Sequence, residues 1–311
     1  MPSSDEGKAK AVLDWCASVV GPCKVVSGDM RFHGRAMVWR LQATSGRYYA
    51  KIHHEKSSWE TEVHGYEQWA PAFGSFVPQL LAVHEEEPLA LLVSELPGEV
   101  MEKVKLPASK ERMAWRDAGS MLINLHNFAV GSCFGRCGRD GVCLGPPVSD
   151  ATAYVLAELE SWLERGKRSD YLTNDELTTV RAAQDLVPAF AGEPPVPCHR
   201  DYNPANWLVT SDGVWAGTID FEFAYWDVRV AEFSRYPGWE WIHRADLLDA
   251  FFEGYGRALT PKEEQQLMVG RVCYALGAIV WGCENSFHGF AAEGRHALKH
   301  LAALLKAGVR G

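Results

Sequence analysis

The spacing of apolar residues changes about one third of the way along the chain. In the first part, short apolar runs rich in β-branched and aromatic residues alternate with glycine-containing turns, a pattern that predicts a small sheet. The expected strands cover residues 23–26, 37–42, 47–53, 77–83 and 89–92. From residue 108 onward, apolar residues recur with the 3.6-residue period of amphipathic helices. The pattern therefore predicts a β-rich lobe at 1–95 and a helical lobe at 96–311, with the dipeptide Pro97-Gly98 as a hinge between them.

Capping signals predict where two helices begin. Ser57, followed three residues later by Glu60, matches a capping box and predicts a helix that continues toward Pro71. Thr260 and Glu263 form a second capping box, which opens a long apolar helix.

Composition is that of an ordinary globular protein. The chain has 311 residues, of which 47% are hydrophobic and 23% charged, enough to bury a substantial core in two lobes. The N-terminal residues are charged where a signal peptide needs an apolar stretch, and the longest apolar run, 272–283, is too short to span a bilayer. We therefore expect a cytoplasmic protein, a monomer or dimer, with no membrane partner.

Eight cysteines are scattered along the chain. A chain of this size does not need disulfides for stability, so reduced thiols are expected. Cys133, Cys137 and Cys143 lie close in sequence but lack the CxxC spacing typical of zinc sites.

The formal net charge is −9. Phosphate backbones are bound by clustered Lys and Arg, and no such cluster is visible, so a nucleic-acid partner is not expected. An acidic surface is compatible with a cationic ligand but does not establish one.

Polar residues are concentrated at 198–206, "CHRDYNPAN" in one-letter code. Two short apolar runs, 207–209 and 214–219, follow around a Ser-Asp-Gly turn, and the second ends at Asp220. This order places Asp201 and Asn206 on one loop and Asp220 at the end of an adjacent hairpin strand.

These three residue types are the ones that phosphoryl transfer from ATP requires. A carboxylate must orient the acceptor hydroxyl and take its proton, and oxygen ligands must hold Mg²⁺ across the phosphates. Asp201 can serve the first purpose, and Asn206 with Asp220 the second; the pattern His-Arg-Asp-(x)4-Asn is that of a kinase catalytic loop. The alternative, an Asx-turn aspartate in a plain polar loop, explains neither Asn206 nor Asp220.

The stretches "CHRDYNPANWLV" and "TIDFEFA" resemble the catalytic loop and metal motif of the aminoglycoside phosphotransferase and choline kinase family. The resemblance implies an α+β, two-lobed, protein-kinase-like fold: a small antiparallel sheet with one helix in the N-lobe, and a large, mostly helical C-lobe. It also implies ATP as phosphoryl donor, with GTP not excluded, and Mg²⁺ as cofactor.

The same resemblance assigns residues of the first lobe. Lys51 lies where the family has its ATP-phosphate lysine, and Glu62 where it has the glutamate that pairs with it. Residues 91–98, "LLVSELPG", resemble the linker that hydrogen-bonds adenine, which points to Ser94 and Leu96. The first hairpin lacks a GxGxxG signature, and candidates for covering the phosphates there are Arg31, His33 and Arg35. In this fold His199 is expected to brace the catalytic loop rather than to take part in chemistry.

Four acidic residues lie in segments that form the acceptor cleft in the family: Asp227, Glu232, Glu240 and Glu284. Each is open to a structural interpretation, as a helix cap or an arginine partner. The tryptophans Trp226, Trp239 and Trp241 are interpreted as core residues, with an aromatic wall for a cationic ligand as the alternative.

The predicted function is ATP-dependent O-phosphorylation of a small hydroxylated molecule. The family resemblance and the acidic cleft favour a cationic antibiotic, either an aminoglycoside or a basic peptide, and hence resistance or self-protection. A housekeeping kinase for choline, a fructosamine or a similar metabolite would use the same machinery. A non-catalytic pseudokinase is the distant alternative, and it is disfavoured because Lys51, Asp201, Asn206 and Asp220 are all present.

Overall fold

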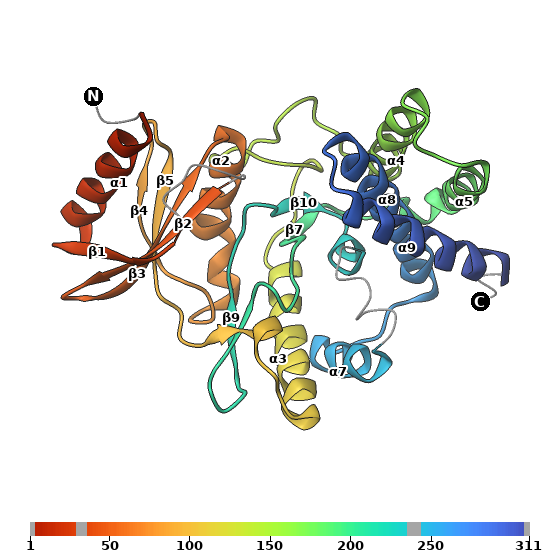
Figure 1. Cartoon of the computed structure of the whole chain (residues 1–311). Helices are drawn as coiled ribbons and strands as arrows, with labels where there is room; N and C mark the ends of the chain where they lie inside the picture. The colour runs from red at the N-terminus through yellow and green to blue at the C-terminus, as the bar shows by residue number, and fades with distance from the viewer. Residues whose placement is uncertain (1–3, 29–35, 235–243, 308–311) are drawn as a thin grey trace.

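The structure, a computed structural model, describes residues 4–28, 36–234 and 244–307. It has the predicted two-lobed, kinase-like architecture, with an antiparallel sheet on one side and a mostly helical part on the other (Figure 1). The predicted boundary near residue 95 falls between a strand of the large sheet and the first strand that pairs with the helical part.

A five-stranded antiparallel sheet, in the order β1-β2-β3-β5-β4, forms the first lobe. Its strands are β1 (Cys23–Ser27), β2 (Ala36–Ala43), β3 (Gly46–His53), β4 (Leu80–His84) and β5 (Ala90–Ser94). All five lie where the apolar runs predicted strands. The structure describes no other strand before residue 95.

Two helices cover the two faces of this sheet: α1 (Ser4–Val20) and α2 (Lys56–His64) (Figure 1). Successive residues of β5 pack against different helices. Leu92 lies in the cluster that contains Val12 of α1, and Leu91 lies in the cluster that contains Val63 of α2. Helix α1 was not predicted from the sequence. The sheet thereby holds α2 against the second lobe.

The predicted capping box of α2 is wrong. The helix begins at Lys56, and its N-cap residue, Glu55, makes no side-chain capping bond. The Ser57 hydroxyl accepts a hydrogen bond from Arg136 at 3.0 Å, so a tertiary contact replaces the local one. The box at Thr260 and Glu263 is confirmed, with both reciprocal bonds present.

The second lobe contains six described α-helices and two small sheets (Figure 1). The helices are α3 (Ala108–His126), α4 (Ala151–Arg168), α5 (Asn174–Gln184), α7 (Ala245–Tyr255), α8 (Pro261–Glu284) and α9 (His288–Ala307). The strands are β6 (Glu99–Val100), β8 (Trp207–Val209) and β9 (Trp215–Thr218) in one sheet, and β7 (Val196–Cys198) and β10 (Tyr225–Asp227) in the other. Short helical turns η3 (Met101–Lys103), η4 (Val187–Phe190) and η5 (Arg229–Phe233) lie between these elements, while η1 (Gly65–Trp69) and η2 (Ala70–Phe73) follow α2 in the first lobe.

Helix α8 is the central helix of the second lobe. By length and composition it is the one described helix that could cross a membrane, yet 72% of its most apolar window is buried. Leu276 and Ile279 pack in one cluster with Leu159 of α4 and Leu301 of α9. Its apolar character is therefore accounted for by packing against α4, α5 and α9.

Helices α3 and α7 approach closely at two glycines. A Cβ added to Gly119 would lie 2.1 Å from the Phe251 carbonyl oxygen, and one added to Gly254 would lie 1.8 Å from that of Arg116. Neither position can hold a larger residue without separating the helices. This contact brings the end of α7 next to the end of α3.

The connection between α3 and α4 reaches across to α2 (Figure 1). Thr61 donates its hydroxyl hydrogen to the Cys137 carbonyl at 3.2 Å, and the His64 Nδ1 atom lies 3.0 Å from the Arg139 carbonyl oxygen. Within this connection Cys133 and Cys143 form a disulfide, which corrects the expectation of reduced thiols throughout. The pairing depends on a hairpin-like turn, marked by a bridge between Cys137 and Cys143, that residue spacing does not reveal.

Candidate active site

Strand β3 and helix α2 bring together the lysine and glutamate predicted from the sequence. The Lys51 Nζ atom lies 2.8 Å from Glu62 Oε2, and it also lies 2.8 Å from Asp220 Oδ1, a residue 169 positions further along the chain. Lys51 is 8% exposed and Glu62 1% exposed. The structure therefore places these three predicted residues around one buried charge.

A fourth residue of this group, Glu222, was not predicted. Its Oε2 atom lies 3.1 Å from Lys51 Nζ. The signal that could have identified it is the second carboxylate of "DFE", two residues after Asp220.

Burial and charge oppose each other at this group. Burial by itself would lower the pKa of Lys51, but Asp220, Glu62 and Glu222 outweigh it and hold that pKa well above its usual value. Burial would raise the pKa of Asp220, and the nearby Lys51 ammonium reverses this effect, so the pKa is lowered. Burial does raise the pKa of Glu222 despite the same ammonium. Lys51 and Asp220 are thus charged at neutral pH.

The catalytic-loop carboxylate is held by two amides from its own loop. Asn206 Nδ2 donates to Asp201 Oδ2 at 2.9 Å and to the Asp201 carbonyl at 2.9 Å. Asn203 Nδ2 donates to Asp201 Oδ1 at 3.0 Å. Both carboxylate oxygens of Asp201 are therefore oriented before any substrate arrives.

The buried His199 side chain connects this loop to the segment that follows β9 and carries Asp220. Its Nε2 atom lies 3.0 Å from the Ile219 carbonyl oxygen, where it acts as donor. The Ile219 backbone N–H in turn donates to the Asn206 carbonyl at 3.0 Å. His199 thus occupies the bracing position that was expected of it. The backbone bond also places Asn206 beside Ile219, the residue that precedes Asp220.

The donor atoms at this point suit Mg²⁺. The amide nitrogen of Asn206 is committed to Asp201, which leaves its amide oxygen as the atom for a cation. The Asp220 and Glu222 carboxylates supply further oxygens. Carboxylate and amide oxygens are the ligands that Mg²⁺ takes in proteins, so Asn206, Asp220 and Glu222 are the residues that would hold it.

The first cavity of the site, which we call the nucleotide cavity, lies between the large sheet and the β8–β9 hairpin and measures about 930 Å³. Lys51, Glu62 and Asp220 line one part of it, and Ser94 and Leu96 of the linker line another. The shape and the polar end suit a nucleotide with its phosphates toward Lys51. The candidates Arg31, His33 and Arg35 lie outside the described residues.

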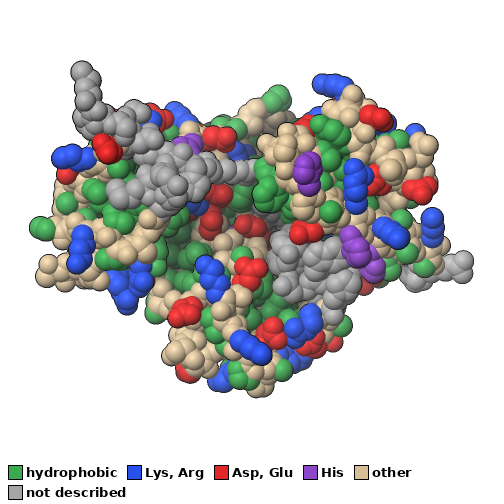
Figure 2. Space-filling model, viewed as in Figure 1, with side chains coloured by type: hydrophobic (Ala, Val, Ile, Leu, Met, Phe, Trp, Pro, Cys, Tyr) green, Lys and Arg blue, Asp and Glu red, His purple; other side chains and the backbone are tan. Residues whose placement is uncertain are grey.

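The second cavity, which we call the acceptor cavity, measures about 620 Å³ and lies within the helical lobe. Its walls combine carboxylates with aromatic rings. The lining includes Glu158, Glu222, Asp227, Trp162, Tyr225, Tyr274, Trp281 and Phe287. Figure 2 shows acidic side chains gathered around the hollow between the sheet and the helices on this face.

Arg200 is the basic residue among the described residues that line the acceptor cavity. Its Nε atom forms an ion pair with Asp227 Oδ2 at 3.1 Å, and its guanidinium lies over the Tyr225 ring at 4.5 Å. A terminal nitrogen lies 3.4 Å from Glu158 Oε1. Burial raises the pKa of Asp227 to about 7, although Arg200 opposes this. Among the described lining residues, the carboxyl groups of Glu158, Glu222 and Asp227 outnumber the one guanidinium.

The four predicted acceptor residues have different positions. Asp227 lines the acceptor cavity. Glu232 does not: it is buried, and its carboxylate accepts the backbone N–H of His199 at 2.7 Å, so it supports the catalytic loop. Glu284 pairs with Arg165 and is absent from the described lining residues. Glu240 lies outside the described residues.

Sequence reasoning also missed Glu158, which lies on α4 and lines the acceptor cavity. No motif surrounds it; its position becomes informative only when α4 packs against α8 and Glu158 comes within reach of Arg200. Trp226 packs edge to face against Trp69 at 5.1 Å, consistent with its interpretation as a core residue. Trp239 and Trp241 lie outside the described residues.

Solved structures of aminoglycoside phosphotransferases share this fold. A thermostable mutant of APH(4)-Ia in ternary complex with AMP-PNP and hygromycin B matches with a TM-score of 0.73 and 14% identity, over 96% of this chain and 99% of that one. The GDP complex of aminoglycoside 2′-phosphotransferase-IIIa matches with a TM-score of 0.71 and 11% identity, over 97% and 99%. The gentamicin complex of APH(2″)-IIa matches with a TM-score of 0.63 and 14% identity, over 93% and 95%.

A comparison with curated proteins finds no match. The family model described as the phosphotransferase enzyme family matches residues 33–267, which is most of the chain and includes the catalytic loop, Lys51 and Asp220. The chain therefore belongs to the phosphotransferase enzyme family, and it is a nucleotide-binding small-molecule kinase that acts on a hydroxyl acceptor.

Proposed function

We propose that this enzyme transfers the γ-phosphoryl group of ATP to a hydroxyl group of a cationic antibiotic. The observation that carries the proposal is the acceptor cavity, in which Glu158 and Asp227 stand among aromatic rings. Carboxylates attract ammonium groups, and aromatic faces bind cations at close range. A polyamine-like molecule with hydroxyl groups fits that chemistry better than a neutral or anionic one.

The residues of the nucleotide cavity bind and orient the phosphoryl donor. The Lys51 ammonium, held by Glu62, contacts the phosphates, and the linker at Ser94 and Leu96 contacts the base. When bound by Asn206 and Asp220, Mg²⁺ neutralises charge on the phosphates. Ligand names in the similar structures include both AMP-PNP and GDP, so GTP is tested beside ATP.

Asp201 is the proposed catalytic residue. Its two carboxylate oxygens are oriented by Asn203 and Asn206, and a carboxylate is the group that accepts a hydrogen bond from the acceptor hydroxyl. The proton of that hydroxyl passes to the Asp201 carboxylate as the phosphoryl group moves to the acceptor oxygen. Positioning and electrostatics account for most of the rate in such a reaction.

The proposed acceptor is an aminoglycoside or a basic peptide antibiotic, and the role is resistance or self-protection. Hygromycin B and gentamicin appear in the names of similar structures, which supports an antibiotic acceptor without identifying it. An aromatic, acidic cavity also suits a quaternary ammonium metabolite such as choline. That metabolite kinase is the second candidate.

A susceptibility screen tests the proposal. A sensitive bacterium expressing the chain is challenged with antibiotics of several classes, beside strains that express Asp201→Asn or Asp249→Asn. Asp249 is exposed on α7, so it serves as the matched control. We expect resistance to at least one cationic antibiotic, lost with Asp201→Asn and kept with Asp249→Asn. Resistance that survives Asp201→Asn would contradict the mechanism.

The purified enzyme separates the two candidates. ATP and GTP consumption is measured with aminoglycosides, basic peptides, choline and fructosamines as acceptors. Turnover with a metabolite and no resistance to any antibiotic would favour the metabolite kinase.

A further inference from the structure

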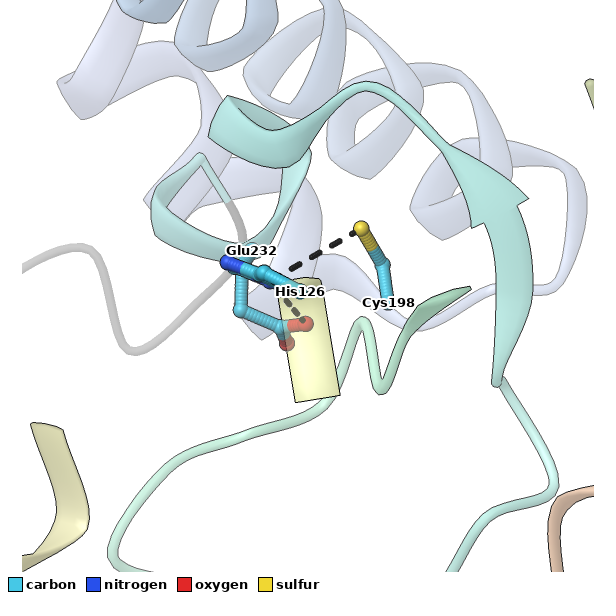
Figure 3. A group of neighbouring side chains, drawn as sticks. All are labelled: His126, Cys198 and Glu232. Carbon is cyan, nitrogen blue, oxygen red and sulfur yellow. Dashed lines mark hydrogen bonds and ion pairs between the residues drawn. The ribbon is translucent and has the colours of Figure 1, made fainter. Parts of the chain in front are cut away.

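Three buried side chains with metal-binding atoms lie behind the catalytic loop. They are His126 at the end of α3, Cys198 at the end of β7, and Glu232 in η5 (Figure 3). None of them is among the described residues that line the nucleotide or acceptor cavity. Their exposed fractions are 1%, 0% and 2%. Three elements from distant parts of the sequence thus meet at one point with a nitrogen, a sulfur and a carboxylate.

The spacing of these atoms is close to that of a tetrahedral zinc site. Cys198 Sγ lies 3.9 Å from His126 Nε2, and Nε2 lies 3.6 Å from Glu232 Oε2. With Zn–S near 2.3 Å and Zn–N and Zn–O near 2.0–2.2 Å, tetrahedral ligands are separated by roughly 3.3–3.6 Å. The third pair, Cys198 and Glu232, also has its ligand atoms within 4.8 Å of each other, so the three side chains can close around one ion.

The surroundings of two of these side chains match those of metal ligands. His126 Nδ1 lies 2.7 Å from the Tyr255 hydroxyl, which fixes the ring with Nε2 toward the cluster. The Oε2 atom of Glu232 accepts the His199 backbone N–H at 2.7 Å. Its other oxygen, Oε1, is buried and has no hydrogen-bond partner among the described residues. A buried carboxylate oxygen without a partner is rare, and a cation would satisfy it.

We propose that His126, Cys198 and Glu232 bind one Zn²⁺ ion as a structural site. The ligands are Nε2, Sγ and the two oxygens of the Glu232 carboxylate, whose Oε2 can retain its backbone bond through a second lone pair. Thiolate and imidazole select zinc over Mg²⁺, which takes oxygen ligands. Binding displaces the thiol proton to solvent, and one thiolate and one carboxylate balance the charge of the ion in the interior.

The site would fasten the catalytic loop from behind. Cys198 lies three residues before Asp201, and Glu232 holds the backbone of His199. An ion bound to both would tie β7 and η5 to α3. This role is independent of the acceptor and of the phosphoryl donor.

Metal analysis of the intact protein tests the proposal. Wild type, Cys198→Ser, Glu232→Gln and Cys16→Ser are produced in zinc-supplemented medium, purified without chelator, and analysed for zinc per chain by plasma mass spectrometry. Cys16 is a buried thiol of the first lobe and is the matched control. We expect about one zinc per chain in wild type and Cys16→Ser, and at least a fivefold lower content in the other two.

Cobalt substitution gives a second measurement. Protein produced with Co²⁺ should show thiolate-to-cobalt absorption in wild type and lack it in Cys198→Ser, while circular dichroism verifies that both are folded. No zinc and no thiolate–cobalt band in folded wild type would overturn the proposal. Equal zinc in wild type and Cys198→Ser would overturn it as well, since the ion would then be bound elsewhere. Neither measurement depends on catalysis, so the proposed function is tested separately.

Discussion

The nucleotide cavity and the acceptor cavity differ in how their polar residues are supplied. Lys51, Glu62 and Asp220 meet around one ammonium within 3 Å, at the positions that the family resemblance assigned to them. The acceptor cavity takes Glu158 from α4 and Asp227 from β10, and neither lies in a motif. Phosphate chemistry demands fixed residue types at fixed places, whereas recognition of a cation needs only charge and apolar area from any direction.

Asp201→Asn should have the largest effect, because it removes the proposed proton acceptor of the transfer. We expect kcat to fall by about 10²–10⁴, the usual contribution of a general base, with little change in KM for either substrate. Steady-state kinetics with Asp249→Asn as control will measure this. A loss below tenfold would mean that proton acceptance by Asp201 is not important.

Lys51→Met should affect the nucleotide cavity alone. The variant removes the cation from three carboxylates and from the phosphates, so kcat/KM for ATP should fall about a hundredfold, equivalent to ~2.7 kcal/mol. KM for the acceptor should stay within twofold. Lys56→Met is the control, because Lys56 is exposed at the start of the same α2. An equal rise in both KM values would show that the two cavities are not independent.

Glu158→Gln should affect the acceptor cavity alone. Loss of one carboxylate near a bound ammonium should raise KM for a cationic acceptor about tenfold, equivalent to ~1.4 kcal/mol, with KM for ATP unchanged. Glu160→Gln is the control, since Glu160 lies on α4 but is exposed outside the cavity. An unchanged acceptor KM would remove Glu158 from the proposed site.

The pH dependence should also distinguish the cavities. Because burial raises the pKa of Asp227 to about 7, this group is neutral below that pH and charged above it. KM for a permanently cationic acceptor should therefore decrease severalfold between about pH 6 and pH 8. Measurements across this range on wild type and Asp227→Asn will check it, and the variant should lose the inflection. An inflection that persists in Asp227→Asn would assign it to another group.

The smallest effect on kinetics is expected from removal of the disulfide in the α3–α4 connection. Its loop bonds to Thr61 and His64 on either side of Glu62, so opening it should loosen the Lys51–Glu62 pair. Cys133→Ser combined with Cys143→Ser should raise KM for ATP two- to threefold and leave the acceptor KM unchanged. Thermal unfolding should show a loss of stability of about 3 kcal/mol, because the unfolded chain without the cross-link has more conformational entropy. Unchanged kinetics would show that α2 is held by the sheet alone.

The sequence was sufficient for the parts of the site that depend on local order. The five strands, the confirmed capping box at Thr260 and the loop with Asp201, Asn206 and Asp220 follow from periodicity, turn residues and spacing. Their side chains converge because a loop of nine residues and a short hairpin leave few alternatives. Lys51 and Glu62 required the family resemblance in addition, since single Lys and Glu residues carry no local signal.

Tertiary packing decided the rest, and it assigned similar residues to opposite roles. Glu232 and Glu158 are both glutamates of the helical lobe, but one is buried under His199 and the other lines a cavity. Ser57 formed a contact with Arg136 in place of the predicted cap, and Cys133 found Cys143 across a turn. The sequence by itself determined the two-lobed fold and the phosphoryl-transfer loop, because both depend on patterns within one or two elements. Tertiary packing decided which acidic residues line the acceptor cavity and which side chains surround His126. Both depend on contacts between elements far apart in the chain, and patterns within one or two elements do not encode such contacts.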